Sequence, residues 1–182
     1  MKAVGIMTHG GPEVLEVLEV PDQEVGSGQI RIRNFAASVN PVDVSVRNGS
    51  MAEIQKINPP PYIPGMDAAG VVDKIGDDVE TDLKVGDSVM AMVVPNGIHG
   101  AYKEYIVLDK NAVVRAPKET SHIQASTLPM NSLTARLSLD LLGLNKGQVL
   151  AVTGGPGAYG GFVIQLAKAD GLTVIADAND SD

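Results

Sequence analysis

The chain has 182 residues, an apolar content of 44% and a formal net charge of −8, from 22 acidic and 14 basic residues. This length allows one large domain or two small ones, and the apolar content is enough for a core. The negative charge argues against a nucleic-acid backbone or an anionic membrane surface as a partner. The chain has no cysteine, which excludes disulfides and thiolate metal sites and suits a reducing cytoplasm.

The start of the chain lacks the apolar core of a secretory signal, and no apolar run reaches the ~18 residues of a membrane span. We therefore expect a cytoplasmic protein that does not cross a membrane.

Short β-type segments fill the first part of the chain, and turns rich in Gly, Pro and Asp separate them. This pattern favours a β-barrel-like domain. A short helix or turn is expected from Asn40 to Gly49, and residues 57–65, with four prolines, are expected to be irregular. The predicted strands cover residues 1–7, 14–20, 29–38, 68–75, 89–94, 102–108 and 113–114.

The pattern changes near Pro117. Ser121 has the character of a helix N-cap, and residues 128–144 contain few helix breakers. We therefore divide the chain into one domain of residues 1–120 and a second of residues 121–182.

The last part of the chain predicts a strand, a glycine-rich turn, a helix and a second strand. Residues 149–153 and 172–176 are uncharged β-rich runs, typical of fully buried parallel strands. Residues 162–170 have helical spacing, and Gly171 stands where a helix commonly ends. Asp177 follows the second strand directly.

The glycine-rich turn has the spacing of a dinucleotide-binding loop. Gly155, Gly157 and Gly160 form a G-x-G-x-x-G frame, and Asp177 lies twenty residues after Gly157. Glycines allow a tight turn and a close approach of the backbone to a diphosphate, and the helix start offers free N–H groups. The alternative is a structural glycine turn without a ligand. Both strands, the helix and the acid are in place, so we favour dinucleotide binding.

Motifs along the whole chain resemble those of the medium-chain dehydrogenase/reductase superfamily, in particular its zinc-free quinone oxidoreductase (zeta-crystallin-like) branch. The resemblance implies an α/β protein in which a GroES-like β-barrel domain precedes a doubly wound Rossmann domain, with the cofactor in the cleft between them. The motifs are MKAV, GGPEVLEV, AASVNPVD, PGMDAAGVV, VGDSVMA, AYKEY, LPMNSLTA and VTGGPGAYGGFVIQLAK.

Members of this family are much longer than this chain. By comparison with them, the chain stops after the second Rossmann strand, so only the first βαβ part of that domain is expected. Two parallel strands leave a sheet edge and its faces uncovered. A fragment, the loss of the remaining part, or completion by another chain are the alternatives.

Zinc-dependent members of the superfamily use a cysteine ligand and a Gly-His-Glu run, but residues 65–67 of this chain read Gly-Met-Asp. His9, His99 and His122 are far apart, and structural roles are expected for them. No metal site is therefore predicted. Without a Lewis acid, the hydride acceptor must already be electrophilic, as quinones and α,β-unsaturated carbonyls are.

The resemblance also implies roles for single residues. Asn40 corresponds to an asparagine near the nicotinamide, as a catalytic and cofactor-binding residue, although an Asn before Pro also caps turns. Asp43 corresponds to a family acid, either catalytic or a helix-start residue. Thr134 corresponds to a threonine near the nicotinamide, or is an ordinary helix hydroxyl. Ser45 and Met51 stand where relatives carry aromatic residues of the substrate pocket.

The family loop aligns with Gly154, Gly157 and Gly160, and Gly155 belongs to the same frame. Ala158 and Tyr159 are expected to contribute the amides and the ring nearest the diphosphate.

The expected coenzyme is NADPH, with NADH possible. Asp177 suits the ribose diol of NADH and repels a 2′-phosphate, yet it stands one position before the acid of NAD-using relatives. Asn179 stands where a phosphate-contacting serine is common in relatives.

The predicted function is NAD(P)H-dependent reduction of a quinone or an α,β-unsaturated carbonyl by zinc-free hydride transfer, in a homodimer. The alternative is a truncated, non-catalytic GroES-like module that acts in binding or dimerisation.

Overall fold

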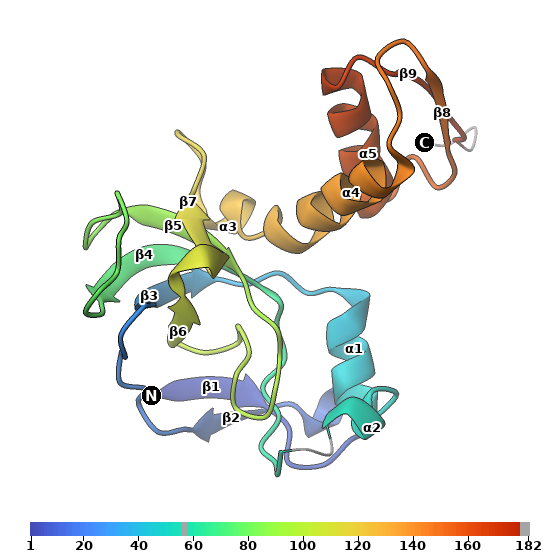
Figure 1. Ribbon diagram of the computed structural model, residues 1–182. Coiled ribbons are helices and arrows are strands. Elements are labelled where there is room, and N and C mark those ends of the chain that lie inside the picture. The colour runs from blue at the N-terminus through green and yellow to red at the C-terminus, as the bar shows by residue number, and fades with distance from the viewer. Residues whose placement is uncertain (56–57, 179–182) are drawn as a thin grey trace. The chain divides into compact units, whose positions relative to one another are not determined.

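A computed structural model describes residues 1–55 and 58–178 (Figure 1). By its contacts the chain divides into two compact units, Met1–Pro129 and Met130–Asp182. Each unit has its own buried core. In the part of the chain that the structure covers, no helix combines the length and apolar character needed to cross a bilayer.

The first unit is built on a five-stranded antiparallel sheet with the strand order β6-β3-β4-β5-β7. Its core is aliphatic: Ile30, Ile32, Val72, Val89 and Ile106 are all 0–1% exposed. The alternation of Ile30 and Ile32 with Arg31 and Arg33 places the isoleucines on the covered face. The strands are β3 (Gln29–Ala36), β4 (Asp67–Ile75), β5 (Ser88–Met92), β6 (Tyr105–Asp109) and β7 (Val113–Arg115).

This sheet is strongly curled. Its two edge strands, β6 and β7, are joined only by the short 3-10 helix η2 (Lys110–Ala112). In a flat sheet the two edges would be about 19 Å apart, whereas the link from Asp109 to Val113 reaches at most about 14 Å. The sheet therefore bends toward a barrel, but β6 and β7 remain its two ends. The predicted barrel is corrected to an open, curled sheet.

A second, two-stranded sheet pairs β1 (Lys2–Gly5) with β2 (Glu16–Glu19) in antiparallel register. A 3-10 helix, η1 (Pro12–Val14), comes between them, so β2 begins two residues after the predicted start at residue 14. β2 is also more exposed than expected of a half-buried strand, since Val17 is 68% exposed.

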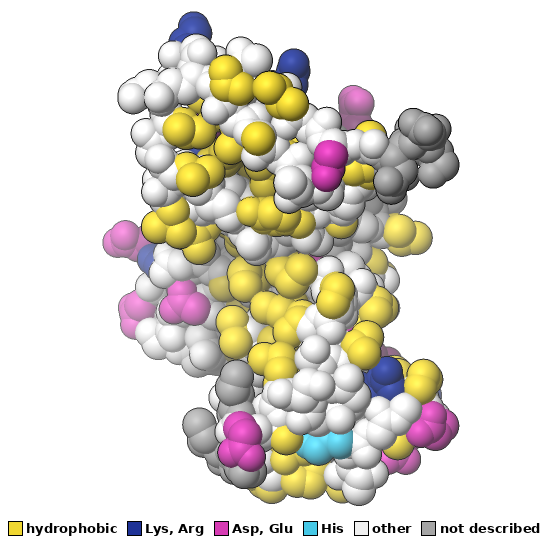
Figure 2. Space-filling model, turned by 90° about the vertical axis from the view of Figure 1, so that its right-hand side faces the viewer, with side chains coloured by type: hydrophobic (Ala, Val, Ile, Leu, Met, Phe, Trp, Pro, Cys, Tyr) yellow, Lys and Arg dark blue, Asp and Glu magenta, His cyan; other side chains and the backbone are white. Residues whose placement is uncertain are grey.

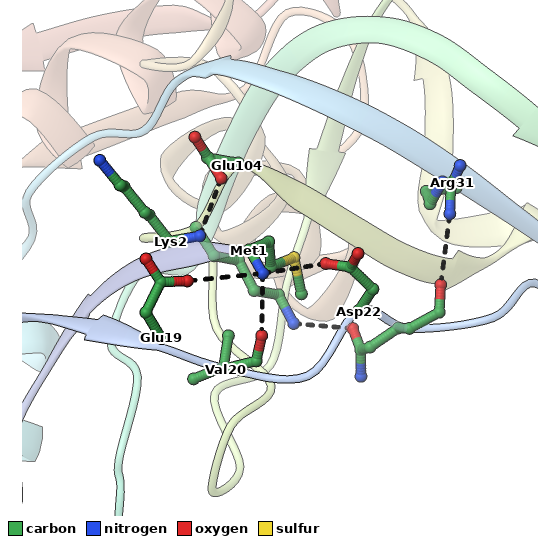
Figure 3. Close-up of polar contacts among 9 residues, drawn as sticks. Met1, Lys2, Glu19, Val20, Asp22, Arg31 and Glu104 are labelled. Atoms are coloured by element: carbon green, nitrogen blue, oxygen red, sulfur yellow. Dashed lines mark hydrogen bonds and ion pairs between the residues drawn. The ribbon is translucent and has the colours of Figure 1, made fainter.

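Polar contacts hold the loop after β2 against β1 and β3 (Figure 3). The amino group of Met1 forms an ion pair with Asp22 at 3.0 Å. Arg31 and Lys103 both donate to Gln23, at 3.5 Å to its carbonyl and 2.8 Å to its side chain. The loop is therefore tied to both sheets through its own residues.

Three short helices accompany the sheets: α1 (Pro41–Asn48), α2 (Ala52–Gln55) and α3 (His122–Ala125). Of the helix or turn predicted after Asn40, the structure has the helix, α1, and Gly49 ends it with φ of 84°. α3 packs against β3, β4 and β5. The first compact unit, which includes α3, ends at Pro129. The domain division that the sequence predicts after residue 120 remains a prediction.

The second unit contains α4 (Pro129–Leu142), β8 (Val149–Val152), α5 (Ala158–Ala169) and β9 (Thr173–Ala176). β8 and β9 are parallel neighbours, as predicted. α5 begins at Ala158, four residues before the predicted start at 162, so Gly160 and Gly161 lie inside its first turns. Glycines have low helix propensity, but close packing against the loop requires Gly160, as shown below.

The strands β8 and β9 are less buried than predicted. Leu150, Val152 and Val174 pack in the core of the unit, but Val149 and Ile175 on the opposite face are 58% and 62% exposed. The described helices cover only one face, so the side chains of the other face meet solvent. Hydrophobic side chains gather on the surface of this unit in Figure 2.

Candidate functional site

A buried polar cluster lies where the chain passes from β3 into α1. Asn40 is 7% exposed, Asp43 is 4% exposed and Asp67 is fully buried. Asp67 is the first residue of β4, and the pairing of Ala36 with Ala69 brings the start of β4 beside the end of β3. The antiparallel register therefore joins residues that are 27 positions apart in the chain.

Hydrogen bonds organise this cluster around two carboxylates. The side-chain amide of Asn40 donates to Asp67 at 2.8 Å and to the hydroxyl of Ser38 at 3.0 Å. That hydroxyl donates to Asp67 at 2.5 Å. Asp43 accepts from the backbone N–H of Asn40 at 2.7 Å and of Gly65 at 2.8 Å. Asp43 thus closes the first turn of α1, and the amide of Asn40 is oriented by Asp67.

Burial shapes the protonation of this cluster. It raises the pKa of Asp43, and the N–H groups of Asn40 and Gly65 oppose that effect. Burial, together with the neighbouring Asp43, also raises the pKa of Tyr102. The Tyr102 hydroxyl donates to the carbonyl of Ser38 at 3.2 Å. Tyr102 therefore remains protonated at neutral pH.

Asp67 and Tyr102 were not among the residues predicted for this site. A usable signal was present, because an acid that opens an otherwise apolar strand is buried only at a cost and needs donors nearby.

A small cavity of about 90 Å³ opens beside the cluster. Ser45 and Met51, the predicted substrate-pocket residues, are both half-buried and are not among its lining residues. The Ser45 hydroxyl donates to the carbonyl of Pro41 at 3.3 Å, within α1. Their role in a substrate pocket remains a prediction. The cavity is lined by Leu15, Val39, Asp43, Val44, Arg47, Pro64 and Tyr102.

In the second unit, the glycine loop joins the end of β8 to the start of α5. Gly154 has φ of 70°, a conformation that favours glycine. A Cβ on Gly160 would lie 2.2 Å from the carbonyl oxygen of Gly154, so α5 approaches the loop as closely as backbone allows. A Cβ on Gly157, the N-cap residue, would come within 3.2 Å of the same oxygen.

The start of α5 presents backbone N–H groups of the kind that bind anions. Ala158 and Tyr159 are the first residues of α5, and the first-turn N–H groups of a helix have no partner within it. They also lie at the positive end of the helix dipole. The Tyr159 hydroxyl donates to Ser138 at 2.7 Å, which anchors its ring to α4.

The remaining predicted cofactor residues behave differently. The Asp177 carboxylate accepts from the N–H groups of Gly154 and Gly155, at 2.6 and 3.3 Å. The Thr134 hydroxyl is exposed and donates to the carbonyl of Met130 at 2.7 Å, one turn earlier in α4. Asn179 lies outside the described residues. The structure thus brings Asp177 to the loop, and the predicted role of Thr134 near the nicotinamide remains a prediction.

Comparison with known proteins identifies the family. The model of the alcohol dehydrogenase GroES-like domain matches residues 26–118. The chain belongs to this family. The predicted membership of the medium-chain dehydrogenase/reductase superfamily and the α/β fold class are thereby confirmed.

Curated relatives of this chain are named as oxidoreductases. The NADPH-dependent alkenal/one oxidoreductase of Arabidopsis thaliana is 36% identical, over 92% of this chain and 44% of the relative. The quinone oxidoreductase of Homo sapiens is 31% identical, over 98% of this chain and 53% of the relative. The chain therefore spans about half the length of the curated relatives it matches.

A solved structure agrees with the fold. The quinone oxidoreductase from Coxiella burnetii superposes with a TM-score of 0.86 at 35% identity, over 100% of this chain and 57% of that chain.

Proposed function

We propose that this chain takes part in the NADPH-dependent reduction of a quinone or an α,β-unsaturated carbonyl, by hydride transfer without zinc. The observation that carries the proposal is the glycine loop between two parallel strands, with the N–H groups of Ala158 and Tyr159 at the start of α5. The names of the quinone and alkenal oxidoreductase relatives support the reaction class, and one of those names supports NADPH over NADH.

The side chains present favour an acceptor that needs no metal. The chain has no cysteine. Across residues 1–55 and 58–178, no group of three or more His, Asp and Glu side chains is arranged to hold a metal ion. A simple ketone needs a Lewis acid or a positioned proton donor to polarise it, whereas a quinone or enone spreads the incoming charge over a conjugated oxygen.

The chain's residues would bind and orient the reactants. Ala158 and Tyr159, the first residues of α5, would hold the diphosphate by backbone N–H groups. When bound, the nicotinamide supplies the hydride, and a proton from solvent completes the two-electron reduction of the acceptor. Asn40 and Asp43 remain predicted near the reacting groups. The bond that Asn40 donates to Asp67 and the bond that Asp43 accepts from Gly65 keep the two side chains in one orientation, as a positioned catalytic group requires.

The test is nucleotide binding followed by turnover. We expect NADPH fluorescence to change on titration with the chain, and absorbance at 340 nm to fall when 1,4-benzoquinone or trans-2-hexenal is added. Gly160→Ala should abolish both signals, because its Cβ would collide with the loop. A flat NADPH titration with folded wild-type protein would refute the proposal.

A second candidate is a non-catalytic module that binds a partner or dimerises. The exposed Val149 and Ile175 on the open face of the β8–β9 sheet favour it. The NADPH titration separates the two candidates, because this module would associate in sedimentation velocity without changing NADPH fluorescence.

A further inference from the structure

The carboxylate of Asp177 lies on the glycine loop itself. One of its oxygens accepts from the N–H groups of both Gly154 and Gly155. The parallel register pairs Val152 with Ala176, which places the residues after β8 opposite those after β9. The backbone N–H of Asp177 also donates to the carbonyl of Val152 at 3.2 Å. Both the backbone and the side chain of Asp177 are therefore committed to the end of β8.

This geometry differs from that of an acid that recognises ribose. Such an acid selects NADH because its oxygens accept from the ribose hydroxyls, and its charge repels the 2′-phosphate of NADPH. The Asp177 oxygen that meets the loop already accepts two hydrogen bonds from the chain's own backbone.

We propose that Asp177 holds the glycine loop in its binding shape and places a negative charge beside the diphosphate. This charge weakens the binding of NADH and of NADPH alike, so Asp177 does not select between them. This inference rests on the proposed function, since it concerns the same loop. Asp177 is then a positioning residue, and coenzyme preference is set by other residues.

The physical reason is that both coenzymes carry the same diphosphate. A carboxylate on the loop repels that diphosphate, whichever coenzyme carries it. Removal of the charge should therefore strengthen the binding of both coenzymes. If Asp177 instead bound the ribose, its loss should weaken the binding of NADH, which would lose a partner, and strengthen the binding of NADPH, which would lose a repulsion.

The first experiment titrates wild type and Asp177→Asn with NADH and with NADPH by fluorescence. Asparagine keeps a side-chain oxygen to accept the loop N–H groups but removes the charge. We expect both dissociation constants to fall about threefold to tenfold. The matched control is Asp140→Asn, which removes one charge from the same unit at a carboxylate that is 62% exposed, and should leave both constants unchanged. Weaker NADH binding with tighter NADPH binding would overturn the inference.

The second experiment needs no nucleotide. Asp177→Ala removes the acceptor, and amide hydrogen exchange at Gly154 and Gly155 should become at least about tenfold faster, with no change in α4. Unchanged exchange at these two glycines overturns the inference and leaves the proposed function standing. If neither nucleotide binds wild type or Asp177→Asn, the proposed function fails, and the charge effect inferred here fails with it.

Discussion

At the scale of single residues, the fully buried carboxylate of Asp67 organises the cluster at the start of α1. Asp67→Ala leaves the Ser38 hydroxyl and the Asn40 amide without this acceptor. We expect the free energy of unfolding to fall by about 2–4 kcal/mol, measured by urea denaturation. Glu80→Ala, at an exposed carboxylate, is the control and should change it by less than about 0.5 kcal/mol. Equal stabilities of the two variants would contradict the role given to Asp67.

Lys103 predicts a pH dependence of stability. It is 5% exposed, and burial lowers its pKa from 10.5 to about 8. Between these values the unfolded chain holds a proton that the folded chain has lost, so stability rises with pH across this window. As pH falls through about 8, the buried ammonium must form and this gain is lost.

Lys103→Met should remove that rise. Between pH 7.5 and 10.5, we expect the free energy of unfolding of the wild type to rise by on the order of 2 kcal/mol more than that of the variant. Urea denaturation at each pH measures both. Lys118→Met, at an exposed lysine, should keep the wild-type slope. Parallel curves for wild type and Lys103→Met would show that the burial of Lys103 has no such effect.

At the scale of elements, two adjacent glycines of α5 make a matched pair. A Cβ at Gly160 would lie 2.2 Å from the backbone oxygen of Gly154, whereas a Cβ at Gly161 meets nothing within 4 Å. Gly160→Ala should therefore force α5 away from the loop and lower stability by about 2 kcal/mol or more. Gly161→Ala should raise it by up to about 1 kcal/mol, because alanine favours the helix. Thermal denaturation monitored by circular dichroism measures both. A loss of stability in Gly161→Ala would refute the argument from space.

At the scale of the whole molecule, exposed apolar side chains govern solution behaviour. Leu133, Leu137 and Leu141 repeat every fourth residue along α4 and are 52%, 60% and 79% exposed. A stripe of this kind normally packs against another element. We therefore expect the chain to bind the dye ANS and to self-associate as its concentration rises.

The double variant Leu137→Gln with Leu141→Gln should reduce dye fluorescence and light scattering without lowering the unfolding midpoint. Leu139→Gln, on the buried face of the same helix at 4% exposure, should lower the midpoint instead. Undiminished dye binding by the double variant would show that this leucine stripe is not the surface that binds the dye and associates. The predicted homodimer remains a prediction that the same scattering measurements test.

Much of the fold was predictable from local patterns, whereas the surroundings of the site were not. The alternation at residues 29–33 predicts β3, and Asn40 followed by Pro41 predicts the start of α1. Asp67 was not predicted as a site residue, because the register of β3 on β4 places its partners, Ser38 and Asn40, beside it. Register depends on how whole strands pack, and no short stretch of sequence contains it.

The sequence by itself determined the absence of thiolate chemistry, the order of strand, glycine loop, helix and strand, and the family. These follow from residue types and from the steric limits of neighbouring residues along the chain. Only the tertiary structure decided that the sheet curls without closing, that α5 begins at Ala158, that one face of β8 and β9 is exposed, and that Asp177 turns back onto the loop. Each of these depends on contacts between residues far apart in the chain, and such contacts form only when the elements pack.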